Sequence, residues 1–329
     1  MGDDASVSIA VIAVVAGEPL VRLERLGEAL ARQSGVVVDV VVAAPPADRA
    51  DIEAAFRPRG AIASLVHVDN PTGARSPGLN RALEAVHARF ICRVDARSLP
   101  DSEYVGRCVS RLEAQPAIGI VGGHQLPMSL SPRVVARALA RVLADPIAAG
   151  GAAYRRPTAS GAVDTVYLGA FRTAELRAIG GWDERLAANE DFELSDRYRA
   201  GGQTVWLEEG IDVGYECRDR LSSVWNQYQA FGAAKVTYWR VTKSRPRLRQ
   251  VLGVGLPIGL ALAVVPAVWL AGWWPPALAF GSLCAIELLR PRTAPLRVRV
   301  VSALLTPMPS LAFALGVCRA SVSPARPRR

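Results

Sequence analysis

The sequence predicts an α/β protein in which a mostly parallel sheet is flanked by helices and followed by C-terminal transmembrane helices. Two observations predict the sheet. Short runs of β-branched and other apolar residues lack polar alternation, as is typical of strands buried on both faces, and helical stretches separate them. A third observation predicts the membrane part, since residues 251–286 and 300–318 contain no charged side chain. A chain of 329 residues has room for about two domains.

The first 145 residues alternate between the two kinds of segment. The apolar run at 7–15 predicts a first buried strand, and Leu23, Leu26 and Leu30 form a stripe along one face of the next helix. The Ser-Pro pair at 76–77 predicts a helix start, with Ser76 as the cap and Pro77 in the first turn. Further strands are expected at 36–42, 64–68, 90–94 and 117–121, and further helices at 51–56, 79–88, 101–115 and 131–144.

In a parallel sheet of this kind, ligands bind outside the carboxyl ends of the strands. The predicted strands place that edge at residues 15–18, 43–48, 69–80 and 95–98. Candidate binding residues are therefore sought there first.

The composition excludes several classes of protein. Hydrophobic residues make up 50% of the chain, which excludes an intrinsically disordered protein. The five cysteines form no CxxC pair, which excludes a cysteine zinc site and a disulfide framework and suits a reducing compartment. The sequence contains no P-loop, GxGxxG, HExxH or GxSxG motif. The net charge of +9 indicates an anionic membrane surface rather than nucleic acid, because no basic patch is interleaved with aromatic residues.

The uncharged run at 251–286 is too long for a single membrane span. As one helix it would measure roughly 54 Å, against a hydrocarbon core of about 30 Å. It predicts two spans at about 251–271 and 273–289, with Trp273 and Trp274 at the membrane interface between them. The run at 300–318 contains two prolines and is either a kinked span or an interfacial helix.

Basic residues flank the predicted hairpin on both sides and indicate its orientation. They are Lys243, Arg245, Arg247 and Arg249 before it and Arg290, Arg292, Arg297 and Arg299 after it. By the positive-inside tendency both ends lie in the cytoplasm. The acidic N-terminus does not resemble a signal peptide. The sequence thus predicts a cytoplasmic domain at 1–245 and a multi-pass anchor in the cell membrane at 246–329. A buried hairpin in a soluble protein is the alternative.

Acidic residues stand at two positions where carboxylates often do chemistry. Asp95 follows a buried strand at the ligand edge of the sheet, where a carboxylate can hold a metal ion or a ribose hydroxyl, or can simply cap a turn. Glu190 and Asp191 open a helix that ends at Gly201. A carboxylate there can act as a base in a cleft, or can simply favour the positive end of the helix dipole.

Two aromatic segments leave their roles open. Trp182 follows Gly180 and Gly181 and either stacks on a sugar or fills the core. The helix around residues 225–232 either lies on the membrane surface or closes an active site.

Seven segments in order resemble one known family, the inverting family-2 glycosyltransferases, and in particular their membrane-anchored succinoglycan-type exopolysaccharide branch. The resemblance extends from about residue 7 to the anchor. The segments are Asp69-Asn70-Pro71, Ser76-Pro77-Gly78-Leu79-Asn80, Arg93-Val94-Asp95-Ala96, Asp164-Thr165-Val166-Tyr167-Leu168-Gly169-Ala170, Ile179-Gly180-Gly181-Trp182-Asp183-Glu184, Asn189-Glu190-Asp191-Phe192-Glu193, and Gln227-Tyr228 with Phe231-Gly232.

The resemblance implies a GT-A fold, a nucleotide-sugar donor, a lipid-linked or glycan acceptor and a divalent metal, Mg²⁺ or Mn²⁺. It implies that Asp191 is the catalytic base and that Glu190 and Trp182 contact the acceptor. Asp95 is the expected metal ligand. The residues that the resemblance implies for the donor are Asp95, Arg97, Asn80, Gly169 with Ala170, and Gln227.

The chain departs from the family pattern at the nucleotide. The strand after residue 36 usually ends in an aspartate that contacts the nucleoside, but here residues 42–46 are apolar and Asp48 comes later. Arg97 stands where a second acid of the metal motif is usual, and a guanidinium neutralises phosphate but does not ligate a metal. These departures support one alternative, a catalytically weak or inactive scaffold protein of a polysaccharide assembly complex. A nucleotidyltransferase lacks support, because residues 16–19 supply no basic, glycine-rich phosphate loop.

Overall fold

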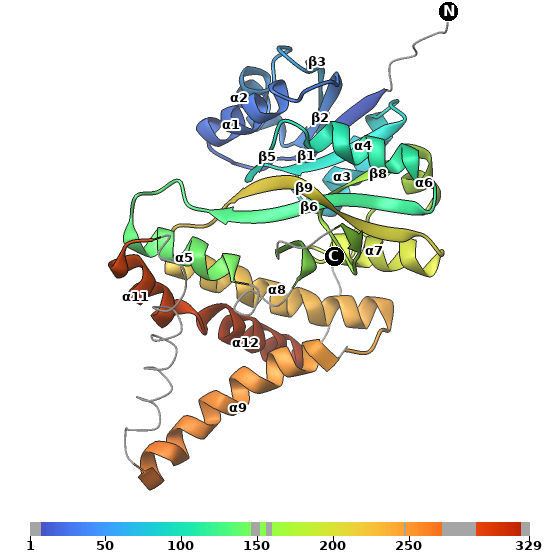
Figure 1. Ribbon diagram of the computed structural model, residues 1–329. Helices are drawn as coiled ribbons and strands as arrows, with labels where there is room; N and C mark the ends of the chain where they lie inside the picture. Colours follow the sequence, from blue (N-terminus) through green and yellow to red (C-terminus); the bar gives the residue numbers. More distant parts are fainter. Residues whose placement is uncertain (1–7, 146–151, 156–159, 247, 272–293, 324–329) are drawn as a thin grey trace, which may run out of the picture. The chain divides into compact units, whose positions relative to one another are not determined.

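The computed structural model describes residues 8–145, 152–155, 160–246, 248–271 and 294–323 (Figure 1). It divides into two compact units. The first comprises Met1–Leu126 with Ala153–Tyr215, and the second comprises Pro127–Ala152 with Glu216–Arg329.

A nine-stranded sheet organises the first unit, in the order β3-β2-β1-β4-β8-β6-β9-β5, with β7 paired to β9. The first four of these strands run parallel and are β3 (Ile62–Asp69), β2 (Val38–Ala44), β1 (Ile9–Val14) and β4 (Phe90–Asp95). The other strands are β5 (Ser98–Pro100), β6 (Ile118–Met128), β7 (Gly161–Ala162), β8 (Tyr167–Arg172) and β9 (Thr204–Glu216). Strand β8 runs antiparallel to β4 and β6, and β9 runs antiparallel to β5 and β7. The predicted α/β fold with helices flanking the sheet is confirmed.

Both faces of β1, β2 and β4 are largely buried, which explains the apolar character of these strands, whereas the edge strand β3 is buried only at Ile62. In β1, Val11 and Ala13 belong to one core cluster, whereas Ala10 and Ile12 belong to the other. The first cluster includes residues of α1 (Leu20–Ala31), α2 (Arg49–Ala55) and α4 (Tyr104–Ala114). The second includes residues of α3 (Arg75–Ala85), α6 (Thr173–Ala178) and α7 (Glu190–Ala200). Successive side chains of a strand point to opposite faces, so each face needs its own layer of helices.

One predicted helix cap, Ser76, and one predicted helix start, that of α5 (Val134–Ala144), were wrong. Ser76 lies inside the first turn of α3, which begins at Arg75 after Ala74, and its hydroxyl donates to the carbonyl of Leu186 at 2.7 Å. Helix α5 begins at Val134 after Arg133 rather than at the Ser-Pro pair 131–132. The Ser76 hydroxyl does not cap the helix because it satisfies a buried carbonyl of a distant segment, which would otherwise lack a hydrogen-bond donor.

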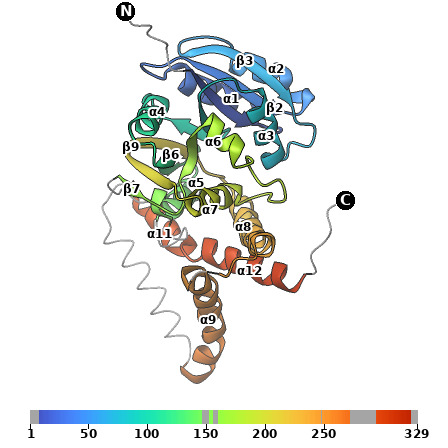
Figure 2. The ribbon, with the colours of Figure 1, turned by 90° about the vertical axis from the view of Figure 1, so that its right-hand side faces the viewer.

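The second unit is helical where it is described. Its longer helices are α5 (Val134–Ala144), α8 (Leu221–Thr242), α9 (Leu248–Ala271), α11 (Leu296–Leu305) and α12 (Met308–Val322). Helix α12 packs on α8 and α9, and α11 packs on α5. Figures 1 and 2 both show one end of α9 standing apart from the other described helices of this unit.

The apolar C-terminal runs form helices as far as the structure describes them. The predicted span 251–271 lies within α9, and the segment 300–318 spans α11 and α12, which meet near Pro307. The predicted span 273–289 lies outside the described residues. Within the described part, one helical stretch, Leu296–Val322, is long and apolar enough to cross a membrane by length and composition, and 39% of its apolar window is buried in the protein.

Candidate active site at the ends of β4, α3 and α7

The candidate site lies where β4 ends and where α3 and α7 begin. Asp95 is the last residue of β4, and Arg93 lies two residues earlier on the same face of the strand. That is the face covered by α3 and α7, because Ile91 of the same alternation packs in the core cluster of these helices. Arg75 is the first residue of α3, and Glu190 and Asp191 are the first two residues of α7.

Two arginines join the acid of the strand to an acid of the helix. Arg93 Nη2 lies 3.0 Å from Glu190 Oε1 and 3.3 Å from Asp95 Oδ1. Arg75 Nη1 lies 3.5 Å from Asp95 Oδ2 and 3.7 Å from Glu190 Oε1. The structure therefore brings together Asp95 and Glu190, which lie far apart in the sequence, around one pair of guanidinium groups.

The cluster is buried on one side and open on the other. The side chains of Arg93 and Glu190 are 3% and 2% exposed, whereas that of Arg75 is 49% exposed. Beneath them the Tyr104 hydroxyl donates to the carbonyl of Arg93 at 3.0 Å. Nε and Nη1 of Arg93 are buried and have no hydrogen-bond partner among the residues that the structure describes. Buried donors without partners are rare in proteins and mark this arginine as unusual.

The two aspartates are in opposite electrostatic environments. Burial raises the pKa of Asp95, but Arg75 and Arg93 outweigh it and hold that pKa below its usual range. Burial also raises the pKa of Asp191; the negative charge of Glu190 raises it further, and Arg93 opposes this only in part. Asp95 is therefore a permanent carboxylate, while Asp191 binds a proton more readily than an ordinary aspartate.

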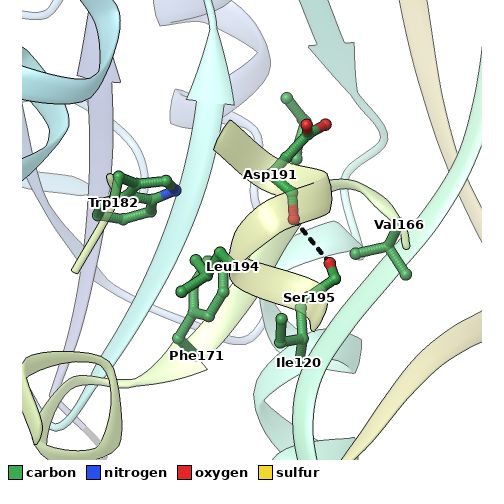
Figure 3. A pocket seen from close by; sticks show the side chains of 8 residues that line it. Ile120, Val166, Phe171, Trp182, Asp191, Leu194 and Ser195 are labelled. Carbon is green, nitrogen blue, oxygen red and sulfur yellow. Dashed lines mark hydrogen bonds between the residues drawn. The ribbon is translucent and has the colours of Figure 1, made fainter. Parts of the chain in front are cut away.

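Asp191 is partly buried at the first turn of α7. Its Oδ1 accepts a hydrogen bond from the backbone N–H of Phe192 at 2.7 Å, and its own carbonyl accepts one from the Ser195 hydroxyl at 2.8 Å. Asn189, just before the helix, has a left-handed backbone with φ of 65°. A pocket lies next to this turn (Figure 3). It is lined by Ile120, Val166, Leu168, Phe171, Trp182, Asp191, Leu194 and Ser195.

The carboxylate of Asp191 points away from Leu194 and Ser195, toward the opposite side of the helix turn (Figure 3). Leu194 and Ser195, which line the pocket, and the carboxylate of Asp191 therefore lie on different sides of the first turn of α7. Burial and the negative charge of Glu190 raise the pKa of this carboxyl, which is the direction that favours a general base.

Strand β8 contributes a distorted backbone to the same region. Leu168 and Gly169 both have positive φ, 68° and 99°. Only glycine adopts such values freely, and a side chain at position 169 would come within 2.9 Å of the Phe171 ring. Leu168 is a strained exception, of the kind that costs of order 1–3 kcal/mol and is usually found near functional sites.

Asn80 and Trp182 are connected to each other. The Asn80 amide donates to the carbonyl of Trp182 and to Glu184 Oε1, both at 2.9 Å, and its oxygen accepts from the Trp182 N–H at 2.9 Å. Trp182 is 2% exposed and packs edge-to-face against Phe171, with ring centroids 5.8 Å apart. Of the two interpretations of Trp182, the structure displays core packing, and Asn80 holds the loop that carries it.

Arg97 and Asp48 lie in loops at the same edge of the sheet. Arg97 Nη2 is 3.9 Å from Glu18 Oε2, and Asp48 Oδ2 accepts a hydrogen bond of 2.8 Å from the N–H of Gly17. The loops that follow β1, β2 and β4 are thereby linked. Gln227 lies in α8 of the second unit, so the role expected for it stays a prediction.

The side chains around Asp95 fit a divalent metal poorly. Both of its oxygens face guanidinium groups, and among the described residues no three His, Cys, Asp or Glu side chains gather as a metal site. Divalent cations such as Mg²⁺ bind through oxygen ligands, and guanidinium groups next to a carboxylate compete with them.

Sequence reasoning missed the two arginines. The sequence could have indicated Arg93, because residues two apart on a strand share a face and Asp95 was already a candidate. Arg75 had no such signal, since its approach to Asp95 depends on how the start of α3 packs beside β4.

Comparison with known proteins agrees with this architecture. No protein-family model matches the chain. The succinoglycan biosynthesis protein ExoA of Rhizobium meliloti (strain 1021) is 25% identical over 210 residues, which cover 63% of this chain and 63% of ExoA. The chain therefore matches less than two thirds of that relative's length. The resemblance to the succinoglycan-type glycosyltransferases is confirmed.

Solved structures show the fold. The mannosyltransferase PcManGT from Pyrobaculum calidifontis, in complex with GDP-Man and Mn²⁺, aligns with a TM-score of 0.59 and 18% identity over 91% of this chain and 86% of its own. The chain has the GT-A fold of such transferases. TarS 1–349 of S. aureus aligns with a TM-score of 0.46 and 13% identity over 95% of this chain and 92% of its own, and the fold assignment rests on the first structure alone.

Proposed function

We propose that the protein is a membrane-associated inverting glycosyltransferase. It transfers a sugar from a nucleotide-sugar donor to a lipid-linked or polysaccharide acceptor in the synthesis of an exopolysaccharide or another cell-surface glycan. The observation that carries the proposal is the meeting of Asp95 at the tip of β4 with the acidic start of α7 around Arg75 and Arg93. The likeness to ExoA supports the biosynthetic role, and the complex of PcManGT with GDP-Man supports a nucleotide-sugar donor.

Asp191 is the proposed general base. An acceptor hydroxyl attacks the anomeric carbon of the donor while Asp191 takes its proton, so a new C–O bond forms as the bond from that carbon to the diphosphate breaks. The diphosphate leaves with the bonding electron pair, and direct displacement inverts the anomeric carbon. A carboxylate with a raised pKa suits this proton transfer, because its proton affinity approaches that needed near neutral pH.

The surrounding residues orient the reactants. Glu190 is almost fully buried and ion-paired with Arg93, so it acts on the acceptor by fixing the start of α7 that carries Asp191. Gly169 and Ala170 shape the backbone beside the donor sugar, and Asn80 holds the loop at Trp182. Arg97, in the loop after β4, is proposed to contact a donor phosphate. PcManGT binds Mn²⁺, but the residues around Asp95 do not form a cage for such an ion, and no step here depends on one.

The C-terminal part is proposed to hold the enzyme at the cytoplasmic face of the cell membrane. Residues 1–245 would form the catalytic domain and residues 246–329 a multi-pass anchor. Two features support this proposal, the candidate span Leu296–Val322 and the exposed apolar side chains of α9. Anchoring raises the effective concentration of a lipid-linked acceptor at the site.

The direct test is an assay of the purified full-length protein, in a mild detergent, against a panel of nucleotide sugars. We expect donor hydrolysis or transfer with at least one of them, with inversion at the anomeric carbon. Asp191→Asn should reduce the rate by about 10²- to 10⁴-fold, the usual effect of removing a general base. No turnover with any donor, together with no donor binding by calorimetry, would support the scaffold alternative instead.

A further inference from the structure

Positively charged side chains surround Asp95, and one of them, Arg97, stands at a position where the family pattern has an acid. Arg75 and Arg93 both contact it, and Arg97 follows two residues later in the chain. The leaving group of the proposed reaction is a diphosphate, whose negative charge grows as its bond to the sugar breaks. A cation must face that charge, and it stabilises the transition state most strongly if the protein holds it in place before the reaction.

Arg75 is the cation best placed to meet a ligand. Its side chain is half exposed, whereas Arg93 behind it is buried. Its contacts to Asp95 and Glu190, at 3.5 Å and 3.7 Å, are ion pairs longer than a good charge-assisted hydrogen bond. A phosphate oxygen can therefore take hydrogen bonds from this guanidinium without displacing a tight partner.

The backbone that carries Arg75 is fixed. The N–H of buried Asn70 donates to Ala44 O at 2.8 Å, and its side-chain amide donates to Ala74 O at 3.0 Å. Behind this turn α3 approaches β1 closely, since a methyl group on Gly78 would lie 2.5 Å from the Asn70 amide and 2.9 Å from Val14. Arg75 also begins an 11-residue helix, whose positive dipole end adds to its charge.

Arg93 supports Arg75 from below. It ties Asp95 and Glu190 together, and these two carboxylates in turn orient Arg75. Its Nε and Nη1, buried and without partners in the described part of the chain, supply further fixed positive potential beneath the open face.

We propose that Arg75, oriented by Asp95 and Glu190 and backed by Arg93, binds the diphosphate of the donor and neutralises it as it leaves, so that nucleotide binding does not require a divalent metal. This inference rests on the proposed function and adds Arg75 to its catalytic residues. Asp95 is then the carboxylate that holds the cation, in place of a metal ligand.

The experiment measures binding of nucleoside diphosphates by calorimetry, with the diphosphates of uridine, guanosine, cytidine and thymidine as probes. Each is titrated into the full-length protein in EDTA and again with Mn²⁺. For the diphosphate that binds, we expect affinities that agree within about twofold in the two conditions. Arg75→Gln should weaken binding in EDTA by about tenfold or more, since a hydrogen bond to a charged group is worth roughly that factor. Arg75→Lys should recover part of the loss, because it keeps the charge without the planar fork.

Arg32→Gln is the matched control, because Arg32 is an exposed arginine paired with Glu28 on α1. It should bind the diphosphate as the unmodified protein does, and thermal unfolding checks that every variant is folded. Binding that needs Mn²⁺ and is unchanged in Arg75→Gln would overturn the inference while leaving the transferase function intact. Binding of none of the diphosphates, with or without Mn²⁺, would overturn both.

Discussion

Asp95 and Asp191 show how one site gives two carboxyl groups different properties. Two arginines lower the pKa of Asp95, whereas burial and a neighbouring glutamate raise that of Asp191. Such separation of two pKa values is a common property of sites in which one acid holds charge and another moves a proton. The division of roles follows from the two guanidinium groups, which form ion pairs with Asp95 and Glu190.

Replacing Asp191 by asparagine should leave the fold as stable as before or slightly more stable. The folded protein raises the pKa of this carboxyl, so folding disfavours its ionised form. This penalty decreases as the pH falls through the raised pKa and disappears only below the ordinary pKa of an unfolded aspartate. Asparagine keeps an oxygen for the Phe192 N–H. The midpoint of thermal unfolding at neutral pH measures the effect. A midpoint lower by several degrees would show that Asp191 serves the fold rather than the reaction.

The acid limb of the activity profile should report Asp191 directly. A base works only when deprotonated, so kcat/KM should rise with pH through a pKa above that of an ordinary aspartate. In Glu190→Gln the limb should move to lower pH, because the negative charge that raises the pKa of Asp191 is removed. Glu193→Gln, in the same helical turn but paired with Arg197, should leave the limb in place. If the acid limb of Glu190→Gln stays at the same pH as in the unmodified protein, the assignment of Asp191 as the general base is contradicted.

At the scale of secondary-structure elements, glycines set the distance between two helices of the second unit. A methyl group on Gly232 of α8 would lie 2.1 Å from the Phe313 carbonyl oxygen of α12, and one on Gly316 of α12 would lie 2.1 Å from the Gln229 carbonyl oxygen of α8. Such distances are far below van der Waals contact. The two helices can therefore pack as they do only with glycine at both positions.

Gly316→Ala should destabilise the protein by about 1–3 kcal/mol, because the added methyl group forces α8 and α12 apart. Gly253→Ala in α9 is the control, since a methyl group there meets nothing within 4 Å and alanine is the better helix former by about 1 kcal/mol. Thermal unfolding of both variants distinguishes them. Equal midpoints would mean that the close crossing of α8 and α12 does not contribute to stability.

The same scale shows why some elements were predicted and others missed. The strands β1, β2 and β4 were found because burial on both faces makes their sequences mainly apolar. Strand β3 was found from Leu65, Val66 and Val68, although most of this edge strand is exposed or half-buried. Strand β8 was missed because Gly169 interrupts it and its backbone has positive φ at both Leu168 and Gly169. Strand β9 was missed because its sequence includes Glu208, Glu209 and Gly210. Their pairing in the sheet outweighs weak local preference.

At the scale of the whole molecule, the net charge of +9 and the exposed apolar side chains of α9 point to a membrane surface. Leu262, Trp269 and Leu270 of that helix are 69%, 88% and 85% exposed. Exposed apolar side chains on one described helix are a feature of interaction surfaces, and the basic composition favours anionic lipid.

The protein should sediment with vesicles of phosphatidylcholine and phosphatidylglycerol more strongly than with phosphatidylcholine alone. Trp269→Glu should weaken this binding by about tenfold or more, because a charge replaces an interfacial aromatic residue. Val37→Glu is the control, as Val37 is 63% exposed but lies beside β2 in the first unit. Equal binding by both variants would argue against α9 as part of the membrane contact.

The sequence by itself determined the parallel half of the sheet, the acids at the tip of β4 and the start of α7, and the apolar C-terminal helices. These follow from local patterns, since burial on two faces dictates composition and helix ends favour acids. Only the tertiary structure decided that Arg75 and Arg93 share the carboxylates of Asp95 and Glu190, and that Trp182 packs in the core. Contacts between residues 75, 93 and 190 depend on which strands and helices become neighbours, which no local periodicity records.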